Sequence, residues 1–218
     1  MRKILRVVAA PMFAAAFVLA ALSAPANADT TADTTESDAE IAQEWQTVWD
    51  TYHFTDTTPP APGSGRSRVT NSISVDINAP AAPVFGKYSD FNNHIGKNPF
   101  LKRVVTHKQW CADDTTYRNL TAIEEIPYEG AIVVSKTHAQ QRLHPEKLYY
   151  ETDSWSQPNV VTHQKIVFTR LPGGKTRVTE NLTFEADSSL IDFVATNGTA
   201  SHQQLQAALK QAIESGEL

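Results

Sequence analysis

Residues 72–101 read SISVDINAPAAPVFGKYSDFNNHIGKNPFL, and this stretch decides the fold. At its start, apolar and polar residues alternate, so that Ile73, Val75 and Ile77 share one face of a predicted strand. Pro80 follows and ends the strand, because a proline cannot donate to a sheet ladder. The stretch therefore predicts a strand with one apolar face at the beginning of a folded domain.

Two short helical segments are expected directly after this strand. The first carries an apolar stripe of Val84, Phe85 and Tyr88. The second begins at Asp90 and is closed by Pro99, since the residue before a proline is biased away from helix. A strand, two short helices and then a long series of strands is an unusual order of elements.

Six further strands are predicted in the middle of the chain. The sequences between them are rich in Gly, Pro, Asn and Asp, which are typical of hairpin turns. Consecutive strands with turns of hairpin length form an antiparallel sheet, to which the first strand adds a seventh. The six predicted strands span residues 102–110, 117–126, 131–142, 147–155, 161–171 and 177–186.

The C-terminal part of the chain has helical periodicity. Apolar residues recur at helical spacing through residues 190–213. Gly198 interrupts this pattern, and Ser201 with Gln204 has the spacing of a capping box, so a bend is predicted near residues 197–200. A curved antiparallel sheet around one long C-terminal helix makes this an α+β domain.

Two segments carry a resemblance to a known family. The runs SVDINAPAAPVF and SDFNNHIGKNPFLKRV resemble the opening of the START-like, or SRPBCC, superfamily, which includes polyketide cyclase/dehydrase and lipid-transport proteins. That family often has tryptophans in the second helix, where this chain has His94, Ile95 and Gly96. The resemblance covers residues 69–216. It implies a helix-grip fold, in which a seven-stranded sheet and a long C-terminal helix enclose a cavity, and it says little about function.

The chain before residue 69 is expected to lie outside this domain. Residues 1–28 have the basic, apolar and small-residue regions of a signal peptide cleaved after Ala28. A retained membrane anchor is the alternative, although its apolar run of about 16 residues is shorter than the roughly 20 that a span needs. Residues 29–54 are expected to be a disordered start followed by an amphipathic helix, and residues 55–68 a Pro/Gly linker. We therefore expect a secreted protein without a stable membrane span after cleavage, with its ligand-binding domain at residues 69–218.

Charge and cysteine content exclude several classes of partner and of stabilisation. The chain has 19 Lys and Arg against 24 Asp and Glu, a net charge of −5. Removal of residues 1–28 takes away three basic residues and leaves −8. Such a chain is not attracted to nucleic acid or to an anionic membrane at long range. The single Cys111 cannot form an internal disulfide, so an apolar core must hold the domain.

The amphipathic helix before the linker has one strongly aromatic face. Ser37 and Glu40 form a capping-box spacing at its start. Three roles remain open: docking onto the domain, a lid over the cavity, or binding of a protein partner through Trp45 and Trp49. The apolar face consists of Ile41, Trp45, Val48, Trp49 and Tyr52.

Glu180 and His138 are the candidate catalytic residues. Glu180 shares a strand face with Val178, Leu182 and Phe184, and burial there without a cationic partner would raise its pKa and suit acid/base work. The alternative for Glu180 is an exposed carboxylate or one paired with an Arg. His138 lies on a strand whose inward face the sequence does not determine, so it is either a pocket residue or a solvated one. The candidate ligand-binding residues are Gln164, Phe168, Phe184, Phe193 and Leu205.

The seven histidines show no HxH or HxxxH spacing, so no metal site is expected. The chain also has no P-loop and no GxGxxG motif, and no cofactor is expected. Three functions then remain. The first is a secreted protein that binds a hydrophobic small molecule, such as a lipid, a polyketide or an isoprenoid-like compound. The second is a cofactor-free enzyme of the polyketide cyclase/dehydrase type that uses acid/base catalysis. The third is a secreted interaction or scaffold protein.

Overall fold

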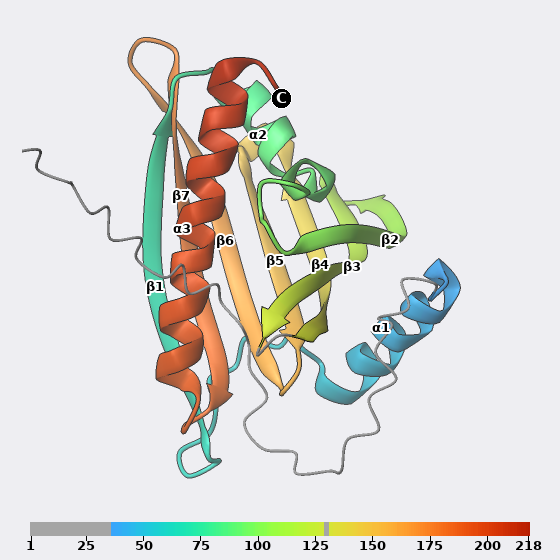
Figure 1. Ribbon diagram of the computed structural model, residues 1–218. Coiled ribbons are helices and arrows are strands. Elements are labelled where there is room, and N and C mark those ends of the chain that lie inside the picture. Colours follow the sequence, from blue (N-terminus) through green and yellow to red (C-terminus); the bar gives the residue numbers. More distant parts are fainter. Residues whose placement is uncertain (1–35, 129–130) are drawn as a thin grey trace, which may run out of the picture.

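The computed structural model describes residues 36–128 and 131–218, so the expected signal peptide lies outside the described residues. Figure 1 shows a strongly curved sheet with one long helix lying along it. The elements in chain order are α1 (Asp38–Tyr52), β1 (Arg66–Ile77), α2 (Ala81–Tyr88), the 3₁₀ turn η1 (Phe91–His94), β2 (Leu101–Ala112), β3 (Thr115–Tyr128), β4 (Ala131–His144), the 3₁₀ turn η2 (Pro145–Lys147), β5 (Tyr149–Ser156), β6 (Val160–Leu171), β7 (Lys175–Asp187) and α3 (Ile191–Ser215).

The described strands form one antiparallel sheet in the order β1-β7-β6-β5-β4-β3-β2. The hairpins from β2 to β7 confirm the predicted meander, and β1 joins it beside β7 as the seventh strand. β1 begins at Arg66, inside the segment expected to be linker. The seven-stranded helix-grip arrangement predicted from the sequence is therefore confirmed.

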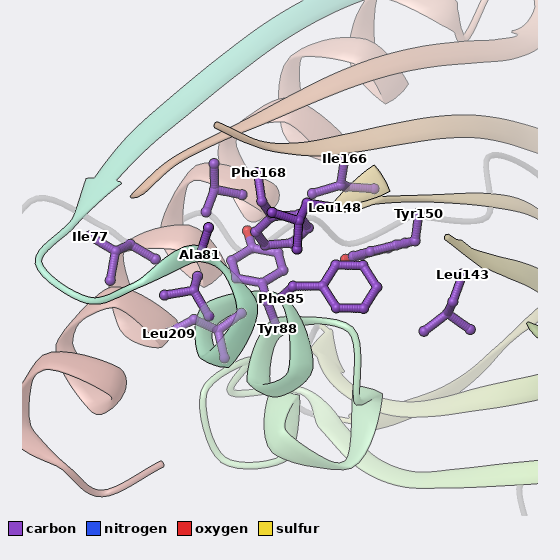
Figure 2. Packing of buried hydrophobic residues seen from close by; sticks show 12 residues of the cluster. Ile77, Ala81, Phe85, Tyr88, Leu143, Leu148, Tyr150, Ile166, Phe168 and Leu209 are labelled. Carbon is purple, nitrogen blue, oxygen red and sulfur yellow. The ribbon is translucent and has the colours of Figure 1, made fainter. Parts of the chain in front are cut away.

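The apolar face of β1 packs into the main core, together with α2. Ile77 is fully buried, and Val75 packs against the same cluster. Figure 2 shows Phe85 and Tyr88 of α2 pointing into the cluster that also contains Phe168 and Tyr150, and the ring centroids of Phe85 and Phe168 lie 5.3 Å apart. α2 is thus held against the sheet by edge-to-face aromatic packing.

α3 is one continuous helix, so the predicted second helix start at Ser201 was wrong. The helix continues through residues 197–200. Gly198 has a different role from the predicted one, because a Cβ placed on it would lie 2.6 Å from Cε1 of Phe184. The glycine allows the helix to approach β7 closely, at a cost in helix propensity of about 1 kcal/mol.

α1 docks on the sheet face opposite α3. Its capping box at Ser37 and Glu40 is formed as predicted. Trp45 is buried, and its indole Nε1 donates to the carbonyl oxygen of Ala139 at 2.9 Å. Its apolar face packs with Phe54, Trp155 and Val161. This agrees with simple docking. The lid hypothesis is wrong, because α1 and the long helix α3 lie on opposite faces of the sheet. Trp45 of α1 is covered by its own domain.

Candidate functional site

A cavity of about 170 Å³ lies between α3, the sheet and the segment from α2 to β2. Aromatic and aliphatic side chains form much of its wall, including Tyr88, Phe91, Tyr150, Phe184 and Leu205. Side chains at alternate strand positions point to opposite faces of the sheet, so the remaining wall residues are those strand residues that point to its concave face. The polar residues along the strands include Glu124, Thr137, Ser154, Ser156, Thr162, Gln164 and Glu180.

Glu180 is the most constrained polar group in this cavity. Only 2% of its surface is exposed. The Tyr88 hydroxyl and Gln206 Nε2 both donate to Oε1, the latter at 3.0 Å. His202 Nδ1 lies 2.9 Å from Oε2 and must donate, because an ionised carboxylate only accepts. Three donors from α2 and α3 therefore converge on one buried carboxylate of β7.

These contacts reverse the expected pKa shift of Glu180. Burial by itself raises the pKa, but the hydrogen bond and charge of His202, with the hydrogen bonds of Tyr88 and Gln206, lower it below its ordinary value. Burial, together with the charge of Glu180, raises the pKa of Tyr88 far above its usual range, so that hydroxyl keeps its proton and donates. The prediction of a raised pKa was wrong, because it assumed that Glu180 had no cationic partner.

A second carboxyl group, Glu124 of β3, lines the same cavity. Asn98 Nδ2 donates to its Oε1 at 2.9 Å. Here burial outweighs that hydrogen bond and raises the pKa of Glu124. The cavity thus holds one carboxyl group whose pKa is lowered, Glu180, and one whose pKa is raised, Glu124. Two carboxyl groups shifted in opposite directions are a suitable pair for acid/base chemistry.

The structure brings together four of the seven predicted site residues. Gln164, Phe184 and Leu205 line the cavity with Glu180, whereas three others do not. Phe168 is buried in the core behind the cavity, in edge-to-face contact with Phe85 and Tyr88. Phe193 is 46% exposed, on a turn of α3 that faces away from the sheet.

His138 is neither a pocket residue nor a solvated one. It is fully buried on the outer face of the sheet, beneath α1. Its Nδ1 is 2.9 Å from the Thr121 hydroxyl, and its Nε2 is 3.5 Å from Glu44 of α1. Burial lowers its pKa. The neighbouring Thr137 faces the cavity instead, so the register of β4 excludes His138 from it.

Sequence reasoning missed the three partners of Glu180. His202 and Gln206 are four residues apart, so they share one face of α3, and that spacing was a signal within the sequence. Tyr88 was assigned to an apolar stripe, where its ring does lie, but its hydroxyl was not considered. Nothing in the sequence indicated that all three would meet a residue of β7.

The described residues offer no obvious place for a metal. Within residues 36–128 and 131–218, no group of three or more His, Cys, Asp or Glu side chains is placed to hold a metal ion. Over the same residues, no helix is both long and apolar enough to cross a membrane.

No family model and no curated protein sequence matches the chain. Solved structures with a similar fold include the aromatase/cyclase Zhui of Streptomyces sp. R1128, with a TM-score of 0.57 and 12% identity over 67% of this chain and 94% of that one. Protein TTHA0849 of Thermus thermophilus has a TM-score of 0.54 and 14% identity, covering 69% of this chain and 100% of that one. Ara h 8.0201 has a TM-score of 0.54 and 16% identity, covering 68% of this chain and 99% of that one. At such identities the likeness concerns the fold. The chain therefore has the START-like, helix-grip fold that its sequence resemblance predicted.

Proposed function

We propose that the mature chain binds a hydrophobic small molecule that carries a hydroxyl group, such as a lipid, a polyketide or an isoprenoid-like compound. One observation carries the proposal: a buried carboxylate, Glu180, is held by three donors inside a cavity with aromatic walls. An apolar ligand gains about 25 cal/mol for each Å² of apolar surface removed from water. The polar groups then determine how the ligand is oriented.

Two polar groups in the cavity have capacity left for a ligand. A carboxylate offers about four acceptor positions, and the protein donors use three of those on Glu180. The fourth suits a ligand hydroxyl. The ring of Tyr150 is buried, and among the described residues its hydroxyl has no hydrogen-bond partner. A ligand with an apolar body and a hydroxyl group would use both positions.

Native mass spectrometry of the chain purified from its own culture medium tests this binding function, with an organic extract of the same sample. A compound of defined mass should accompany the protein. The Glu180→Gln variant should retain less of it, because its amide at that position cannot accept as a charged oxygen does. Thr70→Ser is a matched control at an exposed position away from the cavity. A clean apo mass, with no binding of neutral apolar probes, would contradict the proposal.

A second candidate function is cofactor-free acid/base catalysis on a ligand of this kind, as in a polyketide cyclase/dehydrase. It is favoured by Glu124 and Glu180, whose pKa values are shifted in opposite directions within one cavity. Glu124 would give a proton and Glu180 would accept one. Poly-β-ketone thioester surrogates should then be converted by the wild type. Glu124→Gln should bind them without turnover, and a wild type that binds without converting them would leave only the binding function.

We also propose that the protein is exported after cleavage behind Ala28. The support is the basic start, apolar run and Ala-Asn-Ala site of residues 1–28. Intact-mass analysis of protein from the medium should give a chain that begins at Asp29. Recovery of an uncleaved chain in the membrane fraction would favour the retained anchor.

A further inference from the structure

A second cavity, of about 160 Å³, lies on the same concave face of the sheet. It shares Phe91 and Val104 with the first cavity, so these two side chains form a common wall. Unlike the first cavity, it has a mostly polar lining. The polar residues are Asp90, Asn92, Thr106, Gln109, Arg118 and Gln141.

In the part of the chain that the structure describes, Arg118 is the one cation that lines this second cavity. Its side chain is only partly exposed, and Nε donates to Gln109 Oε1 at 2.8 Å. Nη1 has only long contacts, at 3.4 Å to the carbonyl oxygen of Ser89 and 3.5 Å to Gln141 Oε1. Within the described residues, no carboxylate forms an ion pair with Arg118, and Nη2 has no hydrogen-bond partner. A guanidinium held in a cavity without a counter-charge is well suited to a ligand carboxylate.

Among the described residues, Asp90 is the only carboxylate that lines this cavity, and its side chain is held by neighbouring groups. Its Oδ1 accepts from the backbone N–H and the side-chain amide of Asn92, both at 3.0 Å, and so caps η1. Its charge opposes an anion here, as the charge of Glu180 does in the first cavity. Arg118 is therefore the position in the two cavities that favours an acidic group.

We propose that the ligand is an amphipathic acid, with its apolar body in the first cavity and its carboxylate at Arg118 in the second. This inference rests on the proposed binding function and names the chemical class of the ligand. Phe91 and Val104 line both cavities, so the two cavities adjoin at these side chains, and the proposed ligand runs alongside them. The ligand hydroxyl then lies near Glu180 in the first cavity and its acid group near Arg118 in the second.

Competition binding tests this assignment. N-phenyl-1-naphthylamine, a neutral fluorescent probe, reports occupancy, and decanoate and decan-1-ol compete as ligands of equal chain length with and without the charge. Wild type should bind decanoate more tightly than decanol at neutral pH. Arg118→Gln should lower the decanoate-to-decanol affinity ratio about tenfold, because it removes a charge-assisted interaction. Asp90→Asn, which keeps a capping side chain, should raise the ratio about two- to fivefold. The control Arg170→Gln removes an exposed charge outside both cavities and should leave the ratio unchanged.

The outcomes separate this inference from the proposed function. Probe and decanol binding without any change of the ratio in Arg118→Gln and Asp90→Asn would overturn the acid subsite and leave the binding function intact. Absence of probe binding to the wild type would overturn both. Urea unfolding of each variant checks the fold, and the opposite signs expected for the two variants keep the test decisive if one of them is unstable.

Discussion

Two buried tyrosines allow the Glu180 cluster to be tested with one kind of substitution. Tyr88 and Tyr150 both belong to the same apolar cluster and both line the cavity. The Tyr88 hydroxyl donates to Glu180, whereas the Tyr150 hydroxyl has no hydrogen-bond partner among the described residues. Replacement by Phe removes one oxygen and keeps each ring. Any difference between the two variants therefore measures the hydrogen bond to Glu180.

The expected magnitudes differ clearly. A hydrogen bond to a charged group contributes about 1.5–3 kcal/mol net, so Tyr88→Phe should lower the free energy of unfolding at pH 7 by that amount. Tyr150→Phe should lower it by less than about 0.5 kcal/mol, since no protein partner is left unpaired. If Tyr150 contacts the ligand, its variant should instead weaken ligand affinity. The two substitutions thus separate stability from binding.

Urea unfolding followed by circular dichroism, repeated from pH 3 to pH 7, measures both effects. The pKa of Glu180 is lowered in the folded state, so its stabilisation is complete above its unfolded pKa of about 4.3 and is lost as the pH falls through the folded pKa. The difference between wild type and Tyr88→Phe should be full above the unfolded pKa and should narrow as the pH falls through the lowered folded pKa. Equal costs for the two tyrosine variants at pH 7 would refute the reasoning.

Three further variants test other parts of the structure. Gly198→Ala gains about 1 kcal/mol of helix propensity, but its methyl group meets the Phe184 ring. We expect the free energy of unfolding to fall by up to about 2 kcal/mol, and this loss should disappear in a Phe184→Leu background. A more stable variant would show that the helix does not approach Phe184 closely. Trp45→Phe removes the indole hydrogen bond to the carbonyl of Ala139 and part of a buried ring, and it should cost about 1–3 kcal/mol in urea unfolding. Probe affinity should be unchanged because α1 lies on the opposite sheet face, and altered affinity would contradict this placement. Burial raises the pKa of Glu124, so the stability that this group contributes is full below its unfolded pKa of about 4.3 and is lost as the pH rises through the folded pKa. Glu124→Gln does not titrate, so its free energy of unfolding should rise relative to that of the wild type between about pH 4 and pH 8. A difference between the two proteins that stays constant over this range would contradict the reasoning.

Local patterns were sufficient for most of the secondary structure. The alternation at Ile73, Val75 and Ile77 predicted β1 and its buried face, and Ser37 with Glu40 predicted the start of α1. These signals work because strand periodicity and helix capping act over a few residues. Gly198 misled the same reasoning, because its reason for being glycine is the ring of Phe184, which lies on another element.

The candidate site depended on tertiary structure. Glu180 could be singled out in the sequence, but Tyr88 lies 92 residues away and His202 and Gln206 lie 22 and 26 residues away. Whether a carboxyl group is paired depends on such distant contacts, and so does the direction of its pKa shift.

The strand register and helix docking decided the remaining sites. A shift of one residue in β4 would exchange Thr137 and His138 between the two faces, and the sequence pattern of that strand favours neither. The sequence by itself determined the order of elements, the antiparallel sheet and the C-terminal helix, because these follow from local periodicity and turn chemistry. Only the tertiary structure decided which side chains meet in the cavity, because their contacts join elements far apart in the chain, whose relative placement depends on packing of the whole domain.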